Sequence, residues 1–279
     1  MDRLNTLSYG SNEHYEPAHT SSADVNTSTA KHIARSRSFS SPVATSSNDL
    51  LRSLPAGLFK QLQPSLRSVY LSEEQFLYMQ DDKLDYIYFP ETAVISLVTL
   101  LDAGLIEAIT IGNDGFVGLP VFHGPGATVT RANCQMPGTT WRLSTADFRK
   151  LLPEMPELAR ALDRYSQLVI ETISQSAACN RVHVIEERCA RWLLMSHDRV
   201  ACDEIPLTQE FLAQMLGVRR PGVTVAIGIL ERAGLINHGR GRITVTNRKG
   251  LEAASCECYG AIKRRESILS RGLNKHSRP

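Results

Sequence analysis

The chain has 279 residues, of which 42% are hydrophobic and 22% charged, and its formal net charge is +2. This length suits one large core or two modest ones, and two domains are the more usual outcome. No stretch of about 18 residues is apolar enough to span a membrane, and the first residues lack the apolar segment of a secretory signal. We therefore expect a cytoplasmic protein that keeps its thiols reduced.

The charges are distributed unevenly along the chain. Residues 1–182 carry 15 Lys or Arg and 19 Asp or Glu, whereas residues 183–279 carry 16 and 10. The net charges of the two parts are therefore −4 and +6. A basic segment joined to a mildly acidic one indicates a polyanionic partner, most simply nucleic acid.

The first 48 residues contain 16 Ser or Thr and almost no periodic apolar pattern, which predicts a disordered arm. From Leu50 onward, apolar residues recur at spacings of three and four around Pro55 and Gly57, which indicates one or two short helices. The folded part of the chain is therefore expected to begin at residue 49.

Between Ser68 and Ser144 the pattern changes to short apolar or alternating runs separated by Gly, Pro, Asn and Asp. Such runs are typical of an antiparallel β-barrel or sandwich. The expected strands are 76–79, 86–89, 94–100, 106–111, 129–136 and 139–143, with no helix of ordinary length between them. We expect one jelly-roll-like β domain over residues 49–152.

A long helix is predicted over residues 153–182, followed after a break at Asn180 by a second helix over 184–200. In the long helix, residues at alternating steps of four and three form one apolar stripe: Leu158, Leu162, Tyr165, Val169 and Thr172. A stripe of this kind can pair with a copy of itself or pack on the β domain. Dimerisation is the favoured interpretation, because the helix would lie between two domains.

Residues 207–218 predict a short helix that Thr208 caps and Gly217 ends with a left-handed turn. A second helix follows, with Pro221 suited to its first position and Arg220 as its expected cap. Its inward stripe is Val223, Ile227 and Leu230. Two helices joined by a tight Gly turn form a helix-turn-helix, the motif that places its second helix in the DNA major groove.

The chemistry of the flanking residues agrees with this motif. Arg219 and Arg220 lie at the start of the second helix, where an arginine can hydrogen-bond guanine bidentately. Residues 237–242 and the alternating strand 243–246 predict a β-hairpin wing with Arg240 and Arg242 at its tip. These two arginines are expected to contact phosphates, which position a protein on DNA without reading sequence.

This arrangement resembles the Crp/Fnr family of bacterial transcription regulators, over residues 50–251. The family spacing is followed without a gap by Leu207, Thr208, Gly217, Val223, Leu230, Glu231, Gly234, Leu235 and Ile236. The resemblance implies an α+β chain with a sensor domain at 49–152 and a dimerisation helix at 153–182. A winged helix-turn-helix domain follows at 183–255, and a basic tail at 256–279.

The resemblance also implies roles for individual residues. Thr208 and Arg219 are expected to contact phosphates, and Arg220 is expected to be the main base reader. The other members of the expected DNA-binding surface are Gln209, Gly222, Thr224, Val225, Arg240 and Arg242. Pro221 and Val225 stand where the best-known member has charged side chains, so the target sequence should differ. Val225 either touches a thymine methyl group or has no role in the groove.

The sensor domain departs from the cyclic-nucleotide pattern of the family. Leu119 replaces the ribose-binding glutamate, and no arginine precedes Arg131 in the phosphate region, so we expect no cyclic AMP binding. His123, beside a Gly-Pro-Gly turn, is expected to be solvated. An effector pocket, if the domain keeps one for an unknown small molecule, is expected at Gly118, Leu119, Thr128, Val129 and Ser174.

The six cysteines are scattered, and only Cys256 and Cys258 form a close pair. A zinc or iron–sulfur site usually needs four ligands in paired clusters, so neither a metal nor another cofactor is expected. The iron–sulfur branch of the family needs N-terminal cysteines, and the first cysteine here is Cys134. A redox switch at the C-terminal pair is an alternative.

The sequence therefore predicts a homodimeric regulator that binds a palindromic promoter site. Its expected partners are double-stranded DNA, a second copy of the chain, RNA polymerase and an unknown effector, with no membrane. The alternative is a ligand-sensing module whose winged helix contacts protein, which salt-dependent DNA binding would exclude. No enzyme is expected, since the sequence has no P-loop, G-x-S-x-G or H-E-x-x-H motif.

Overall fold

The computed structural model describes residues 46–275 except 103 and 201, without the side chains of residues 269–275. Residues 1–45 of the predicted arm lie outside the described part. Residues 46–48, which the sequence assigned to the arm, belong to the described part, and Asn48 is fully buried and caps the first helix. Its side-chain amide donates to the carbonyl oxygens of Pro90, at 2.8 Å, and Gly115, at 2.9 Å.

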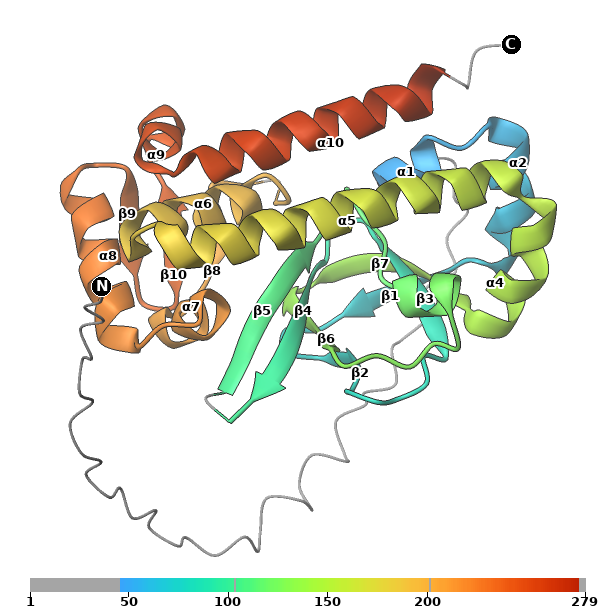
Figure 1. Ribbon diagram of the computed structural model, residues 1–279, viewed down its shortest axis with the longest axis horizontal. Coiled ribbons are helices and arrows are strands. Elements are labelled where there is room, and N and C mark those ends of the chain that lie inside the picture. Colours follow the sequence, from blue (N-terminus) through green and yellow to red (C-terminus); the bar gives the residue numbers. More distant parts are fainter. Residues whose placement is uncertain (1–45, 103, 201, 276–279) are drawn as a thin grey trace, which may run out of the picture. The chain divides into compact units, whose positions relative to one another are not determined.

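The β domain consists of two antiparallel sheets with short helices at their ends (Figure 1). One sheet has the strand order β1-β7-β3, and the other β2-β6-β4-β5. The strands are β1 (Arg67–Leu71), β2 (Phe76–Tyr78), β3 (Tyr86–Pro90), β4 (Val94–Leu101), β5 (Gly104–Ile111), β6 (Arg131–Met136) and β7 (Gly138–Ser144). The six predicted strands are confirmed with ends shifted by one or two residues, and β1 is an additional strand.

Four helices accompany these sheets. They are α1 (Asp49–Arg52), α2 (Ala56–Leu62), α3 (Leu119–His123) and α4 (Thr145–Leu151). The five-residue α3 lies in the loop between β5 and β6, where no helix of ordinary length was expected. Pro120 in its first turn and Gly118 at its N-cap allow this short helix to form.

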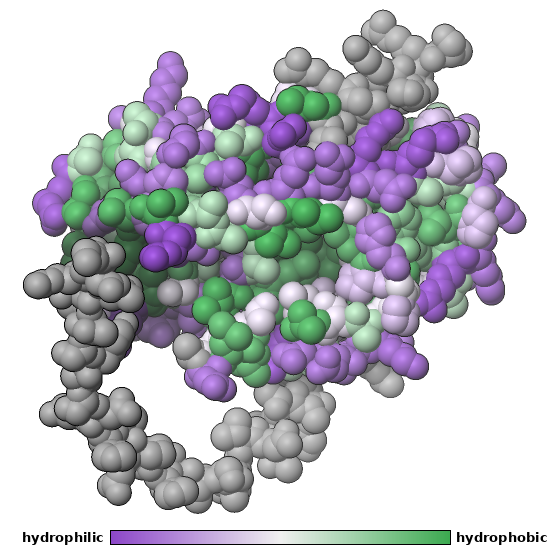
Figure 2. Space-filling model, viewed as in Figure 1, coloured by the Kyte–Doolittle hydropathy of each residue, from purple (hydrophilic) through white to green (hydrophobic). Residues whose placement is uncertain are grey.

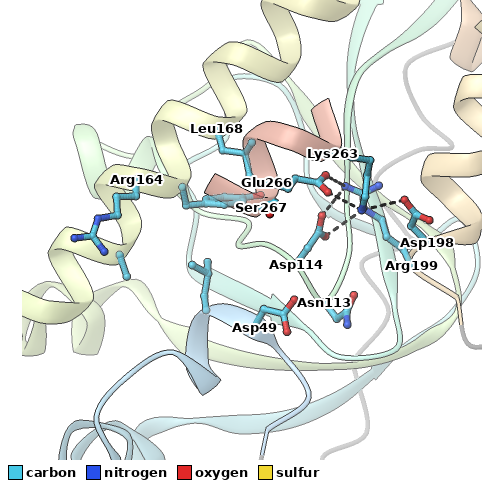
Figure 3. Close-up of a pocket in the computed structure, with 13 residues that line it drawn as sticks. Asp49, Asn113, Asp114, Arg164, Leu168, Asp198, Arg199, Lys263, Glu266 and Ser267 are labelled. Carbon is cyan, nitrogen blue, oxygen red and sulfur yellow. Dashed lines mark hydrogen bonds and ion pairs between the residues drawn. The ribbon is translucent and has the colours of Figure 1, made fainter. Parts of the chain in front are cut away.

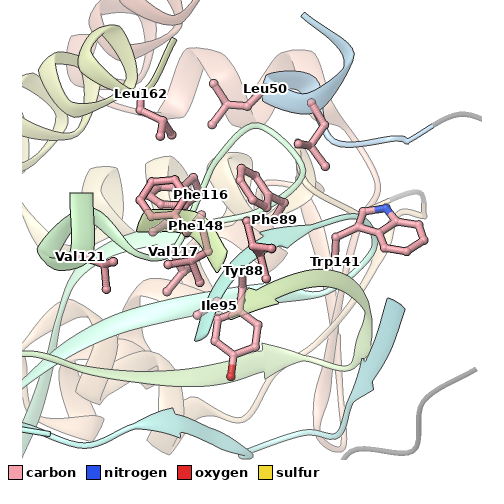
Figure 4. Close-up of a cluster of buried hydrophobic side chains, with 14 of the residues drawn as sticks. Leu50, Tyr88, Phe89, Ile95, Phe116, Val117, Val121, Trp141, Phe148 and Leu162 are labelled. Carbon is pink, nitrogen blue, oxygen red and sulfur yellow. The ribbon is translucent and has the colours of Figure 1, made fainter. Parts of the chain in front are cut away.

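Aromatic rings pack together in the core of the β domain, on the side of α1 and α5 (Figure 4). Phe89, Phe116 and Phe148 are fully buried, with ring centroids 5.1 Å apart for Phe89 and Phe116 and 6.2 Å apart for Phe116 and Phe148. Gly118 packs so closely that a Cβ there would lie 2.5 Å from Ile87 Cγ2 and 2.7 Å from the Phe116 ring. This part of the β domain is therefore filled by side chains.

The long helix α5 (Pro156–Val182) contacts the β domain along one face (Figure 1). All five residues of the predicted stripe are at most 6% exposed, and four of them belong to the β-domain core. The prediction that this stripe forms the dimer interface is therefore wrong. Its other interpretation, packing on the β domain, is the one observed. The exposed large apolar residues of α5 are Ile170, Ile173 and Val182.

The remaining elements build a winged helix. They are α6 (Ile185–His197), α7 (Gln209–Leu216), α8 (Arg220–Arg232) and α9 (Arg248–Ala254), with the small sheet β8-β10-β9. Its strands are β8 (Glu204–Pro206), β9 (Ile236–Gly239) and β10 (Arg242–Val245). Residues 257–275, which the sequence assigned to a basic tail, instead form the helix α10 (Glu257–Lys275), which lies along α5.

The winged helix packs directly on the β domain. Val94 and Val98 of β4 belong to the same buried cluster as Leu193 of α6 and Leu212 of α7. At this interface the indole N–H of Trp192 donates to a Glu107 carboxylate oxygen at 2.8 Å. None of the helices among the described residues combines the length and apolar character that a membrane crossing needs.

Candidate DNA-binding surface

The first helix of the motif starts and ends where the sequence indicates. The Thr208 hydroxyl oxygen accepts a hydrogen bond from the backbone N–H of Phe211 at 3.1 Å, which caps α7. Gly217 ends the helix in the left-handed conformation, with φ 61° and ψ 41°. Leu212, Leu216 and the neighbouring apolar residues point into the buried cluster of the winged helix. The position of α7 is therefore fixed by a cap, a turn and a core.

Arg188 of α6 holds the turn between α7 and α8 in place. Its guanidinium is buried and donates to the carbonyl oxygen of Leu216, one of the acceptors that the end of α7 leaves unpaired. Burial lowers the pKa of Arg188 from its usual value. The sequence analysis did not identify this residue, because its role depends on a contact across 28 positions of the chain.

The second helix, α8, begins one residue earlier than expected. Arg219 is its N-cap and Arg220 its first residue, so the prediction of Arg220 as the cap is wrong. Pro221 still lies in the first turn, where its missing N–H costs nothing. A Cβ on Gly222 would come within 3.0 Å of Ile185 Cδ1, so this glycine allows α8 to approach α6 closely.

The outward face of α8 is accessible along its length, while its inward stripe is confirmed. Val223, Ile227 and Leu230 are at most 3% exposed. Of the predicted DNA-binding residues on or next to this helix, Arg219, Arg220, Thr224 and Val225 are exposed, and Gly222 is partly buried. An isoleucine, Ile229, is also 38% exposed farther along the helix. The structure thus gathers four predicted contacts at the N-terminal half of one open helix face.

Gln209 joins α7 to α8 and to the wing, the hairpin of β9 and β10. Its side-chain oxygen accepts from the Thr224 hydroxyl at 2.7 Å, and its side-chain nitrogen lies 3.1 Å from His238 Nε2. The backbone N–H of His238 in turn donates to Glu231 at 2.9 Å. Gln209 and Thr224 were predicted, but His238 was not. Its position next to Gln209 makes it a further member of this surface.

The arginines at the wing are both exposed. Arg240 lies in the turn between the two strands, and Arg242 is the first residue of β10. Arg242 pairs loosely with Glu204 at 3.7 Å, and Arg220 with Glu210 at 3.9 Å. Because all four side chains are more than half exposed, these pairs are weak and leave the guanidinium groups available to an anion.

Comparison with known proteins agrees with this geometry. Residues 187–254 match the model of the Crp-like helix-turn-helix domain. FixK2 from Bradyrhizobium japonicum is similar in structure, with a TM-score of 0.60 and 18% identity over 68% of this chain and 98% of that one. Residues 187–254 therefore form a Crp-like helix-turn-helix domain. The chain as a whole has the fold of the Crp/Fnr regulators.

Two further solved structures have the same fold. A regulator of the Crp/Fnr family from Eubacterium rectale aligns with a TM-score of 0.59 and 15% identity, over 74% of this chain and 96% of its own. The c-di-GMP responsive regulator CLP of Xanthomonas campestris aligns with a TM-score of 0.57 and 14% identity, over 68% and 98%. A search of curated protein sequences found no match. The matched domain contains the helix-turn-helix, a motif that places its second helix in the DNA major groove.

The residues predicted for an effector pocket are not assembled into one. Gly118 is packed against Ile87 and Phe116, and Leu119 starts the short helix α3. Val129 is 67% exposed. Ser174 is exposed on α5 and lines a groove between α5 and α10, to which Gly118, Leu119, Thr128 and Val129 do not contribute. The family pattern did not indicate that Gly118 is closed in by Ile87 and Phe116, or that Ser174 lines a groove beside α10.

His123 is exposed, as the sequence indicates, and it also makes one hydrogen bond to protein. Its Nε2 lies 2.7 Å from the hydroxyl oxygen of Ser166 on α5. The residue therefore links the end of α3 to the long helix.

A cavity of about 390 Å³ lies elsewhere, where α5, the end of α6, α10 and the loop after β5 meet (Figure 3). Asp114 in this loop pairs with Arg199 at 2.6 Å. Lys263 of α10 contacts Asp198 at 3.1 Å and Glu266 at 2.7 Å. Burial acts to raise the pKa of Asp198, but hydrogen bonds from Arg248 and the charge of Lys263 outweigh it and hold this pKa below its usual value.

Proposed function

We propose that the protein recognises a specific DNA sequence with the N-terminal half of α8 in the major groove. The observation that carries this proposal is the open face of α8, where Arg219, Arg220, Thr224 and Val225 are exposed together at the start of the helix. Arg220 is the main base reader, because an exposed arginine at this point can place two donors on guanine O6 and N7. The uncharged Val225 contacts a base edge through its methyl groups.

Phosphate contacts come from residues next to the reading helix. Thr208 lies beside the wing and its Arg240 and Arg242, because the N–H of Leu207 donates to the carbonyl oxygen of Gly241 at 2.9 Å, and Arg219 is the cap of α8. Such contacts orient a protein on DNA and supply most of the salt-dependent affinity. Gln209 holds α7, α8 and the wing in one arrangement through Thr224 and His238.

The test begins with selection of bound duplexes from a random library by the full-length protein. On the enriched duplex, Arg220→Ala should weaken binding by about 1–3 kcal/mol for each half-site, which is about 5- to 150-fold, and should relax the sequence preference. Arg219→Ala should weaken binding to all sequences alike. It should also reduce the slope of log affinity against log salt concentration by about one. Arg232→Ala, an exposed arginine at the far end of α8, is the matched control and should bind normally.

Two results would contradict the proposal. Unchanged preference in Arg220→Ala would show that another residue reads the bases. Binding that does not fall steeply with added salt would favour the alternative, a winged helix that contacts protein.

We further propose that the protein is a homodimer on a palindromic site. A two-fold axis would place two α8 helices about one helical turn of DNA apart, roughly 34–36 Å. Since the predicted stripe is buried, we propose that pairing uses the outer face of α5, where Ile170 is 65% and Ile173 39% exposed. Figure 2 shows apolar surface along the middle of this helix. These residues are three apart and share one helix face.

The oligomeric state tests this assignment directly. Light scattering and native mass spectrometry should give twice the chain mass for the wild type, and a monomer for Ile170→Asp/Ile173→Asp. Leu101→Asp, at a 50% exposed leucine at the end of β4, is the control for a general effect of added charge. A wild-type monomer at micromolar concentration, or an unaffected dimer in the double variant, would contradict this use of α5.

The remaining partners follow from the same proposal. A regulator that binds chromosomal DNA acts in the cytoplasm and alters transcription by RNA polymerase. Transcription in vitro from a selected site will test this effect.

We propose that a small-molecule effector enters the cavity between Arg164, Arg199 and Lys263. Native mass spectrometry of the purified protein should then show added mass that Arg164→Ala removes.

A further inference from the structure

Three cysteines and a histidine meet away from the DNA-binding surface and from both large cores. Cys179 and His183 lie at the end of α5, and Cys256 and Cys258 lie where α10 begins. The ligand atoms of all four residues are within 4.8 Å of one another. The three cysteines are at most 5% exposed and form a buried cluster of their own.

The spacing of these atoms suits a tetrahedral ion. With zinc bonds of about 2.3 Å to sulfur and 2.0–2.1 Å to nitrogen, two sulfurs should be about 3.8 Å apart, and a sulfur and a nitrogen about 3.6 Å apart. The sulfurs of Cys179 and Cys256 are 3.5 Å apart, and the Cys258 sulfur lies 3.6 Å from His183 Nδ1. Two opposite edges of the expected tetrahedron are therefore nearly in place.

The surrounding residues orient the candidate ligands. Glu257 lies 3.0 Å from His183 Nε2 and, as the acceptor there, keeps the proton on this nitrogen and leaves Nδ1 free to bind an ion. Gln175 donates from its side-chain amide to the Cys258 sulfur at 3.0 Å. A carboxylate behind a metal-binding histidine is a common arrangement at zinc sites.

Buried positive charge lies next to the cluster. Arg188 and Arg191 are buried, and each lies close enough to Cys179 to interact with its charge. The Nε atoms of both arginines have no hydrogen-bond partner among the described residues. Three thiolates and one Zn²⁺ carry a net charge of −1, which these guanidinium groups would balance.

We propose that Cys179, His183, Cys256 and Cys258 bind one zinc ion as a closed structural site. Four protein ligands of this type leave no open position for a substrate, which distinguishes the site from a catalytic one. Soft thiolate and imidazole ligands select zinc over magnesium or calcium. On binding, the three thiols release their protons to solvent and the sulfurs bind the ion as thiolates.

The location of the site indicates its role. Cys179 and Cys256 are 77 positions apart, and the Crp-like domain at residues 187–254 lies entirely between them. His183 is also the C-cap of α5, two residues before α6 begins. A bound ion would therefore join the two ends of the DNA-binding domain and fix its connection to the long helix.

The first experiment measures the metal content of the full-length protein purified under reducing conditions. Elemental analysis should find about one zinc per chain. After chelation, Co²⁺ alone should restore binding with the visible absorption of a tetrahedral thiolate complex. Metal removal should lower the midpoint of thermal unfolding by about 5 °C or more, since the ion closes a long loop.

Variants then assign the ligands. Cys179→Ser, His183→Ala, Cys256→Ser and Cys258→Ser should each weaken zinc binding at least tenfold, whereas Cys202→Ser, at an exposed cysteine outside the cluster, should keep it. The Co²⁺ spectrum of the wild type decides the matter if a variant fails to fold. Absence of zinc and of Co²⁺ binding, iron with inorganic sulfide, or a Cys179–Cys256 disulfide in the reduced preparation would each overturn the proposal.

Discussion

Replacement of Glu107 tests how the β domain is attached to the winged helix. Glu107 is partly buried on β5, and it accepts from Trp192 of α6 at 2.8 Å and contacts the Ser96 hydroxyl at 2.6 Å. Burial raises the pKa of Glu107, although hydrogen bonds from Ser96 and Trp192 oppose the shift. The group therefore joins two domains and carries a proton more readily than an ordinary glutamate.

The count of hydrogens agrees with a protonated carboxyl group. The single hydroxyl proton of Ser96 faces both Glu107, at 2.6 Å, and the side-chain oxygen of Gln135, at 2.8 Å. The second contact needs either a proton on Glu107 or a rotated Gln135 amide. In the first case Glu107→Gln reproduces the neutral acid closely.

Glu107→Ala and Glu107→Gln should change the free energy of unfolding by different amounts. Glu107→Ala leaves the indole N–H of Trp192, a residue 4% exposed, without its acceptor, at a cost of about 1–3 kcal/mol. The lost side chain adds a cavity at the interface. Glu107→Gln keeps an oxygen for Trp192 and should change the free energy of unfolding by less than about 1 kcal/mol.

The pH dependence of unfolding provides an independent test. A carboxyl group with a raised pKa binds a proton in the folded protein at pH values where the unfolded chain has lost it, so stability falls as the pH rises from about 4.5 through the raised pKa. Urea unfolding at several pH values should show this loss in the wild type and not in Glu107→Gln. Equal effects of Ala and Gln, or a wild type that gains stability relative to Gln as the pH rises, would refute the reasoning.

Three other replacements test local features by urea unfolding. Gly217→Ala should lower the free energy of unfolding by about 1–2 kcal/mol, because the backbone at this position is left-handed. Gly57→Ala, in a helix with open space around it, should raise the free energy of unfolding slightly. No loss at Gly217 would mean that the turn is not left-handed. Thr208→Ala should lower the free energy of unfolding by about 1 kcal/mol, because the helix loses its cap, and Thr208→Ser should keep most of the stability of the wild type. Asp198→Asn should be less stable than wild type at neutral pH. That difference should shrink as the pH falls below 3.8, because the folded state holds the Asp198 pKa below this value; a constant difference would contradict its ion pairs.

The DNA-binding motif could be predicted because its signals are local. A capping hydroxyl at Thr208, a left-handed glycine at position 217 and a proline in the next first turn each act within a few residues. The one-residue error at Arg220 reflects the freedom of Pro221 to occupy either of the first two helical positions. The exact first residue of a helix is therefore not fixed by the local sequence alone.

Features that depend on distant contacts could not be predicted. The period of the α5 stripe indicates one buried face, but not whether Leu162 meets the β domain or a second chain. The cluster of Cys179 and Cys256 forms across 77 positions and has no spacing signature. Residues 257–275 contain many basic side chains, and their contact with α5 becomes visible only in the fold.

The central claim is specific DNA recognition by the exposed start of α8. Its most direct test is the ratio of affinities for the selected duplex and for a scrambled duplex of equal length, measured by fluorescence anisotropy at one fixed salt concentration. The wild type should prefer the selected duplex by about 1,000-fold or more, and Arg220→Ala should lose most of this preference while still binding both duplexes. A ratio near one for the wild type, or a ratio that Arg220→Ala leaves unchanged, would contradict the claim.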